Sequence, residues 1–169
     1  MMKIDFFKDE QIVSDNYFGL CDDEDESSKT PAYVDTNPGN KDRWIADVRN
    51  ISGKSIGFAA VDNKIEIIRD DGSMENRCDA MLHNDDYIIF VELKVQGKDW
   101  IKHAVEEQLQ TTIDIFKSCH DIRQFRRRIA YACNKRHPAF AVSHKEYMQR
   151  FRKRNDVRLI IGCSILLKA

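Results

Sequence analysis

Residues 87–95 read YIIFVELKV, and this stretch determines which fold the chain can adopt. Its apolar residues occupy both faces, which is typical of a central strand that is covered on two sides. Glu92 and Lys94 interrupt the run, and an unpaired charge is costly to bury in such a strand. Because side chains alternate along a strand, these two project to one face while Leu93 projects to the other, into the core. The pattern predicts a buried strand with two charges on one face.

A second strand is expected immediately before this one, at residues 77–82 (RCDAML), with a polar turn over residues 83–86. Closing this hairpin pairs Asp79 with Phe90. Asp79 then shares the face of Glu92 and lies diagonally across from it, at roughly 7–8 Å between backbones. Two carboxylate side chains and one cation can span that gap. A slip of one residue would move Asp79 to the other face.

Further strands and helices are expected on both sides of the hairpin. The patterns predict strands near residues 56–61, 64–69, 127–133 and 157–167, helices near 99–118 and 144–155, and helical spacing at 44–48. We expect residues 55–169 to form one α/β domain whose mixed central sheet is flanked by helices on both faces. Residues 1–54 are expected to be an N-terminal segment that packs on this core and contains an irregular acidic loop at 21–43.

The charges are distributed unevenly along the chain. The formal net charge is −1, but residues 117–169 hold 14 Lys and Arg against 3 Asp and Glu. Such a basic third favours an anionic partner such as nucleic acid, and solvated helix faces would explain it almost as well. The candidate phosphate contacts are Arg126, Arg127, Arg128, Lys135 and Arg136, followed by Arg150, Arg152, Lys153 and Arg154, which would equally suit the C-terminal end of a helix.

The cysteines and the first residues bear on the cellular compartment. Five cysteines, widely spaced and without a CxxC pair, argue against a disulfide framework or a structural zinc site. The opening MMKIDFFKDEQ lacks the basic and apolar parts of a signal peptide, and no apolar run reaches the length of a membrane span. We therefore expect a cytoplasmic protein with reduced thiols and no membrane segment. A homodimer is also compatible with the sequence, which leaves the oligomeric state open.

Asp79, twelve intervening residues and then Glu92-Leu93-Lys94 on an apolar strand resemble the D-x(n)-(D/E)-x-K signature of the PD-(D/E)XK nuclease superfamily. The resemblance covers roughly residues 55–135 and implies the αβββαβ core of the restriction endonuclease-like fold. Cys78 stands where the family most often has proline.

The resemblance implies a role for each residue of the motif. Asp79 and Glu92 would bind a divalent cation, normally Mg²⁺ with Mn²⁺ as a substitute, helped by the backbone carbonyl of Leu93, and hard oxygen ligands suit such ions. Lys94 would orient or deprotonate the attacking water and offset charge in the transition state. Gln108 resembles the glutamine that some members place beside the site.

The chain departs from the family at two further places. Thr112 stands where members with that glutamine have a tyrosine, and a polar surface role for Gln108 is equally compatible with the sequence. Many members also carry an acidic residue on the first helix, for which Asp47 and Glu10 are the candidates.

Two functions from different classes follow. The first is a Mg²⁺-dependent nuclease that hydrolyses phosphodiester bonds, of DNA more than RNA. The second is a catalytically inactive nuclease fold that serves as a binding or immunity-type inhibitor protein, with the acidic segment 22–26 engaging a protein partner. In that case Asp79, Glu92 and Lys94 form an inert ion network that holds the strands in register.

Overall fold

The computed structural model describes residues 3–23, 27–95, 99–136 and 144–169, and within these ranges the chain forms two β-sheets and a set of helices. The larger sheet has the order β1-β5-β6-β7-β8-β9, with the bounds β1 Gln11–Val13, β5 Ile56–Ala60, β6 Ala80–His83, β7 Tyr87–Lys94, β8 Arg127–Asn134 and β9 Arg158–Ile161. The smaller sheet has the order β10-β4-β2-β3, with the bounds β2 Tyr17–Cys21, β3 Tyr33–Asp35, β4 Ala46–Asn50 and β10 Ser164–Leu167.

The longest helical segment is continuous and follows β7. It comprises α1 Trp100–Lys102, the π-helical η2 His103–Leu109 and α2 Gln110–Cys119, and the other helices are α3 Lys145–Asn155 and the short 3-10 turns η1 Pro38–Arg43 and η3 Ile122–Gln124. No helix in the described ranges is long and apolar enough to cross a membrane.

The α/β class expected from the sequence is confirmed, and β7 lies inside the larger sheet as predicted. It pairs antiparallel with β6 and parallel with β8, and β8 pairs parallel with β9. Its residues are buried from Tyr87 through Leu93. The strands β5, β6 and β7, the helical segment and then β8 therefore follow one another as the sequence indicated.

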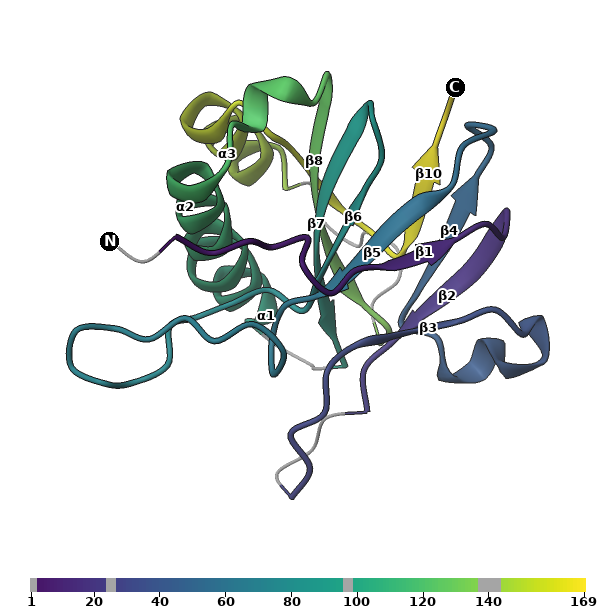
Figure 1. Cartoon of the computed structure of the whole chain (residues 1–169), viewed down its shortest axis with the longest axis horizontal. Helices are drawn as coiled ribbons and strands as arrows, with labels where there is room; N and C mark the ends of the chain where they lie inside the picture. The colour runs from purple at the N-terminus through teal and green to yellow at the C-terminus, as the bar shows by residue number, and fades with distance from the viewer. Residues whose placement is uncertain (1–2, 24–26, 96–98, 137–143) are drawn as a thin grey trace.

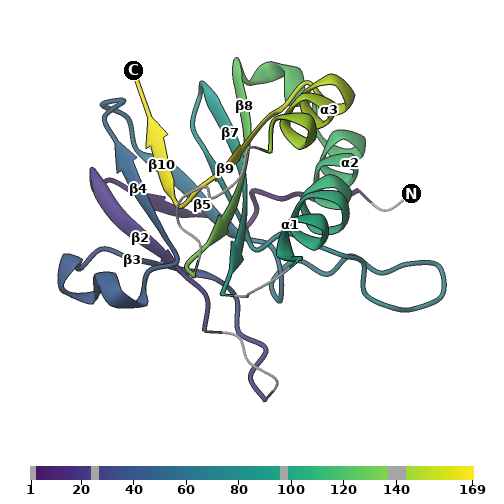
Figure 2. The same ribbon diagram turned by 180° about the vertical axis from the view of Figure 1, so that it is seen from behind.

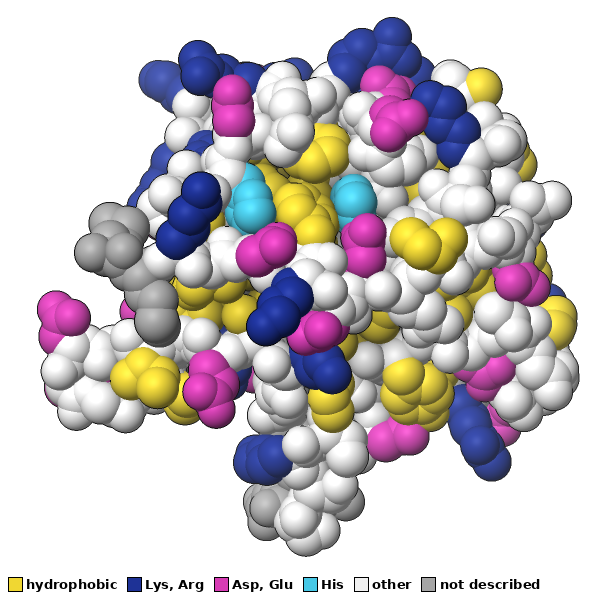
Figure 3. Space-filling view, viewed as in Figure 1, with side chains coloured by type: hydrophobic (Ala, Val, Ile, Leu, Met, Phe, Trp, Pro, Cys, Tyr) yellow, Lys and Arg dark blue, Asp and Glu magenta, His cyan; other side chains and the backbone are white. Residues whose placement is uncertain are grey.

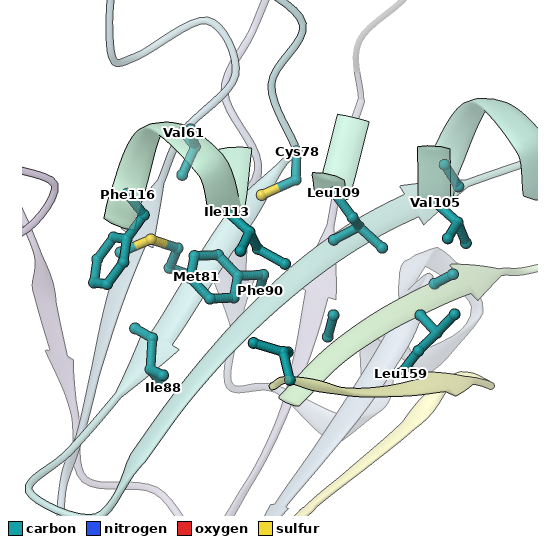
Figure 4. Close-up of a cluster of buried hydrophobic side chains, with 14 of the residues drawn as sticks. Val61, Cys78, Met81, Ile88, Phe90, Val105, Leu109, Ile113, Phe116 and Leu159 are labelled. Atoms are coloured by element: carbon teal, nitrogen blue, oxygen red, sulfur yellow. The ribbon is translucent and has the colours of Figure 1, made fainter. Parts of the chain in front are cut away.

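One face of the larger sheet is covered by helices. Figures 1 and 2 show α2 and α3 together on this side. Phe90 of β7 and Met81 of β6 pack here against Ile113 and Phe116 of α2, as Figure 4 shows, and the rings of Phe90 and Phe116 meet edge to face with centroids 5.3 Å apart. Apolar residues at helical spacing, including Leu109, give the helix the stripe that this face buries.

The other face is covered by the smaller sheet, so the expectation of helices on both faces needs correction (Figures 1 and 2). Ile89, Val91 and Leu93 of β7 share a buried cluster with Phe18 of β2 and Val48 of β4. Before β5 the described residues form no α-helix, and the αβββαβ core is therefore not reproduced at its first element.

Residues 44–48 contribute to a strand and not to a helix. Along β4 buried and more exposed positions alternate, with Ala46, Val48 and Asn50 buried, which is the period of a strand. Trp44 lies against Gly19 of β2, where a Cβ atom would come within 2.0 Å of the indole. A glycine is therefore needed for this packing.

Two further expectations differ from the structure. Residues 64–69 form no ladder strand, and the only bridge there joins Ile68 to Met74 within the described residues. Residues 157–167 divide at Gly162 into β9 and β10, which belong to different sheets. The buried positions continue at every second residue through this bend, from Val157 to Leu167, and this is why the sequence looks like one strand.

The N-terminal 54 residues are divided between both sheets. Their first strand, β1, pairs with β5 of the larger sheet, and β2, β3 and β4 form most of the smaller one. The acidic loop expected at 21–43 contains β3 and η1, and its residues 24–26 lie outside the described residues.

Candidate active site

Asp79 and Glu92 face each other across the hairpin of β6 and β7. The ladder pairs Ala80 with Val91, and the N–H of Asp79 donates to the carbonyl of Val91 at 3.1 Å, so Asp79 lies opposite Glu92. The sequence predicted a pairing with Phe90, and the observed register is shifted by two residues. A shift of two keeps every side chain on its expected face, because the period of a strand is two.

The shift arises because the turn is tighter than the sequence indicated. The N–H of Asn84 donates to the carbonyl of Tyr87 at 3.1 Å, which leaves Asp85 and Asp86 as the loop. The side-chain oxygen of Asn84 accepts hydrogen bonds from the N–H groups of Asp86 and Tyr87, both at 2.8 Å. An asparagine that bonds to the backbone two residues ahead is a common turn former.

Asp79, Glu92 and Lys94 lie on the face that the helices cover, whereas Leu93 points into the core between the sheets. The Nζ atom of Lys94 is 3.2 Å from Oε1 of Glu92. Oδ2 of Asp79 accepts a hydrogen bond from the N–H of Leu93 at 2.6 Å. Asp79 is 5% exposed and Glu92 is 1% exposed. The structure thus brings the three residues of the motif together in a buried cluster.

Burial changes the proton affinity of both carboxyl groups. Burial, and then the negative charge of Glu92, raise the pKa of Asp79 well above its usual range, against the hydrogen bond from Leu93. Burial raises the pKa of Glu92 to about 7, although the ammonium of Lys94 acts in the opposite direction. The single ammonium of Lys94 therefore does not compensate the two buried carboxyl groups. Asp79 and Glu92 together favour the binding of a proton, or of a cation in addition to Lys94.

The donor atoms fit a divalent cation of the magnesium type. Oε2 of Glu92 is buried and has no hydrogen-bond partner among the described residues, so it is available to a cation. No group of three or more His, Cys, Asp and Glu side chains that could hold a metal occurs in the described part of the chain. Mg²⁺ is commonly held by one or two carboxylates, with water and substrate phosphates as its other ligands, and Asp79 with Glu92 matches that pattern.

Two acidic residues other than the candidates for the first helix act electrostatically on this cluster. Asp47 lies on β4 and accepts a hydrogen bond from Ser164, and the carboxylate of Glu10 contacts the imidazole of His83. By contrast, the charge of Asp22 raises the pKa of Asp79, and the charge of Asp62 raises the pKa of Glu92. Sequence reasoning missed these two, because nothing local links them to the motif.

Thr112 of α2 positions the chain just before β6, and sequence reasoning missed this role as well. Its hydroxyl oxygen accepts a hydrogen bond from the N–H of Cys78 at 2.7 Å and donates to the carbonyl of Gln108 at 2.8 Å. A proline at position 78 would have no N–H to donate. The two departures from the family, cysteine for proline and threonine for tyrosine, therefore form one contact in this chain, directly beside Asp79.

Gln108 lies in the π-helical segment η2, a type of segment that is frequent at functional sites. Its Oε1 atom is buried and has no hydrogen-bond partner within the described ranges. A buried acceptor without a donor is unfavourable unless a ligand or water completes it. This observation is compatible with the role beside the site, which stays a prediction.

Replacing Thr112 with Val keeps the shape of the side chain but removes the acceptor of the Cys78 N–H. We expect the free energy of unfolding to fall by about 1–3 kcal/mol, because a buried donor loses its partner. Urea unfolding of this variant measures the change. Thr111→Val serves as the control, since Thr111 is next in the helix and only partly buried. Equal losses in both variants would show that the contact with Cys78 does not matter.

Four of the basic residues singled out in the sequence, Arg150, Arg152, Lys153 and Arg154, lie on α3. The five residues around β8 fall into two groups. Arg127 pairs with Tyr87 at the start of β7, five residues before Glu92, and five residues of strand span about 17 Å. Arg126 and Arg128 flank it at that same, distant end. Lys135 and Arg136 instead follow the end of β8 beside Lys94, whose carbonyl accepts a hydrogen bond from the Lys135 N–H at 2.9 Å. Of these five residues, the structure therefore brings Lys135 and Arg136 to the carboxylate end of the sheet.

A cavity of about 880 Å³ lies elsewhere on the surface. His83, His120 and Phe7 contribute to its lining, and Figure 3 shows two histidines on either side of an apolar patch on this face. The lining does not include Asp79 or Glu92. The two carboxyl groups are closed off in this conformation, and a phosphodiester would reach them only after neighbouring side chains move.

Comparison with known proteins assigns the chain to no family. The resemblance rests on Asp79, Glu92 and Lys94, on their shared face and on the order of the strands that carry them. A scan against protein-family models found no match, and searches of curated proteins and of solved structures found none either.

Proposed function

We propose that this protein is a metal-dependent nuclease that hydrolyses phosphodiester bonds of nucleic acid, DNA in preference to RNA. The observation that carries the proposal is the buried pair of Asp79 and Glu92, with one oxygen of Glu92 lacking a partner among the described residues and Lys94 beside it. Buried charges seldom add to stability, so a chain that keeps two carboxyl groups together in its core has a reason other than stability.

Each residue of the cluster has a distinct part in the proposed reaction. Asp79 and Glu92 would hold the cation, and the N–H of Leu93 keeps one oxygen of Asp79 in place. When bound, Mg²⁺ supplies positive charge that stabilises charge developing on a phosphate oxygen and lowers the pKa of a nearby water. The ammonium of Lys94 offers hydrogen-bond donors at the same place, which suits orientation of the attacking water and stabilisation of the transition state.

A catalytically inactive binding protein is the second candidate. It is favoured by the closure of the site, since Glu92 is 1% exposed and its other oxygen is paired with Lys94. In this alternative the ion network only holds β6 and β7 in register, and the acidic segment that begins at Asp22 engages a protein partner.

Calorimetric titration of the protein with Mg²⁺ and with Mn²⁺, beside a plasmid-nicking assay and an RNA-cleavage assay, tests the proposal. We expect saturable binding of one ion and nicking of the plasmid that depends on it. Faster cleavage of RNA would reverse the order of substrates. Absence of both ion binding and cleavage would favour the inactive alternative, because an inert network has no need of a cation.

A further inference from the structure

A second concave surface extends along β8 from the end of the larger sheet that is remote from Asp79 and Glu92 as far as Tyr131, which pairs with Val91. It has a volume of about 550 Å³. We call this surface the basic groove, because six cationic residues contribute to its lining. They are Arg126, Arg127, Arg128, Arg152, Arg158 and Lys168. Asp156 is the only acidic residue of the lining within the described part of the chain. Figure 3 shows Lys and Arg side chains along the upper edge of the molecule, where β8 begins.

The three consecutive arginines are largely engaged within the protein. Arg126 is bound to Asp86 at 2.9 Å and Arg128 to Asp156 at 2.9 Å. Arg127 contacts the hydroxyl of Tyr87 and lies over its ring, 5.0 Å from the centroid. These contacts fix the start of β8, so much of this positive charge is already compensated.

Arg158 and Lys168 differ from these arginines. Within the described ranges, the Arg158 guanidinium and the Lys168 ammonium have neither an ion pair nor a side-chain hydrogen bond, and both residues are exposed. They belong to different sheet regions, since Arg158 begins β9 and Lys168 follows β10. The groove therefore carries two uncompensated cations in a chain whose net charge is −1.

The floor of the basic groove is apolar. It is formed in part by Ile129 and Ile160, which are partly buried, and by Leu166, which is 37% exposed. A cationic rim around an apolar floor suits a ligand with anionic groups on one side and flat apolar surface on the other. A single nucleic-acid strand has this character, because its phosphates and its unstacked bases are both accessible. A duplex presents mainly phosphates at its surface and would leave the floor unused.

We propose that the basic groove binds single-stranded nucleic acid, with Arg158 and Lys168 as its phosphate contacts and the apolar floor against the bases. The choice of nucleic acid as the class of ligand rests on the proposed function. Arg158 pairs with Ile129, which pairs with Ile89, three residues before Glu92. A strand held at Arg158 would therefore be anchored about 10 Å along β7 from the carboxyl groups, away from the bond that is cut. The groove would then add affinity without taking part in the chemistry.

Binding of a short labelled oligothymidylate, measured by fluorescence anisotropy in EDTA over a series of salt concentrations, tests the inference apart from cleavage. Each phosphate contact to a single strand contributes about 0.7 to the slope of log affinity against log salt. The double variant Arg158→Ala, Lys168→Ala should therefore lower the slope by about 1.4, and lower the affinity about 25-fold at 0.1 M salt. The affinity for a duplex of the same length should be nearly the same in the double variant and in the unchanged protein.

The matched control is the double variant Lys8→Ala, Lys64→Ala, which removes the same charge. Both lysines are exposed, and they flank β1 and β5 at the opposite edge of the larger sheet. Equal losses in the two double variants would reduce the effect to net charge and overturn the inference. The inference would also be overturned if the Arg158→Ala, Lys168→Ala variant kept the salt slope of the unchanged protein. It would be overturned likewise if the groove bound anionic lipid vesicles but not the oligonucleotide. If the protein binds the oligonucleotide through the groove but does not cleave nucleic acid, the inference about the basic groove stands and the proposed nuclease function is refuted.

Discussion

Replacing Asp79 with Asn, or Glu92 with Gln, should abolish metal binding and reduce cleavage by about 10²–10³ or more, while the protein remains folded. Both changes keep the shape of the side chain and remove the charge that holds the cation. The Asn side chain retains an oxygen that can accept the Leu93 N–H, so the backbone contact at Asp79 is preserved. Without metal, each variant should be as stable as the unchanged protein, because one of two like charges is gone.

Thermal melts with and without Mg²⁺, together with calorimetry, measure this result. A ligand at 100 times its Kd stabilises a folded protein by about 2.7 kcal/mol, and this increment should disappear in both variants. Asp15→Asn and Glu106→Gln are the controls, since both residues are exposed and undergo the same chemical change. If each variant of the cluster instead lost about 3–5 kcal/mol of stability, with no metal effect in the parent, the inert ion network would be the correct description.

Replacing Lys94 with Ala should separate binding from chemistry. We expect metal affinity to be unchanged or higher, because the competing ammonium 3.2 Å from Glu92 is removed. Cleavage should fall by about 10² or more, since help to the attacking water and to the transition state is lost. Titration calorimetry and single-turnover cleavage at saturating Mg²⁺ give the two quantities independently.

Lys94→Met is a useful companion variant, because it keeps the apolar stem of a side chain that is only 13% exposed. It should behave like the Ala variant in cleavage and cost less in stability. Lys102→Ala, an exposed lysine of α1, is the control and should change neither quantity. A parallel loss of metal affinity and cleavage in both Lys94 variants would mean that the lysine organises the carboxylates and has no separate role in the reaction.

The parts of the fold that the sequence predicted are those with a long hydrophobic pattern. Residues 87–95 and 99–118 are such stretches, and they became β7 and the helical segment that follows it. The smaller sheet was missed because its strands are short. In particular, Trp44, Ile45 and Val48 have a spacing that a helix would also produce, although β4 begins only at Ala46.

The candidate site was predictable to the extent that alternation along strands determines it. The face shared by Asp79, Glu92 and Lys94 survived a register error of two residues, because such an error does not exchange faces. The contact of Thr112 with Cys78 could not be predicted in this way. It joins residues 34 positions apart, and no local pattern shows which helix position lies over the start of β6.

The bend at Gly162 has a consequence for how the two sheets hold together. The chain leaves the larger sheet at β9 and enters the smaller sheet at β10 after only two residues. It makes the same crossing from β1 to β2 near the N-terminus and returns to the larger sheet from β4 to β5. Each sheet thus contains strands from both ends of the described chain. No single cut would release one sheet intact, so the two layers should melt together as one cooperative unit, and the layer behind the carboxylates cannot be gained or lost as a separate module.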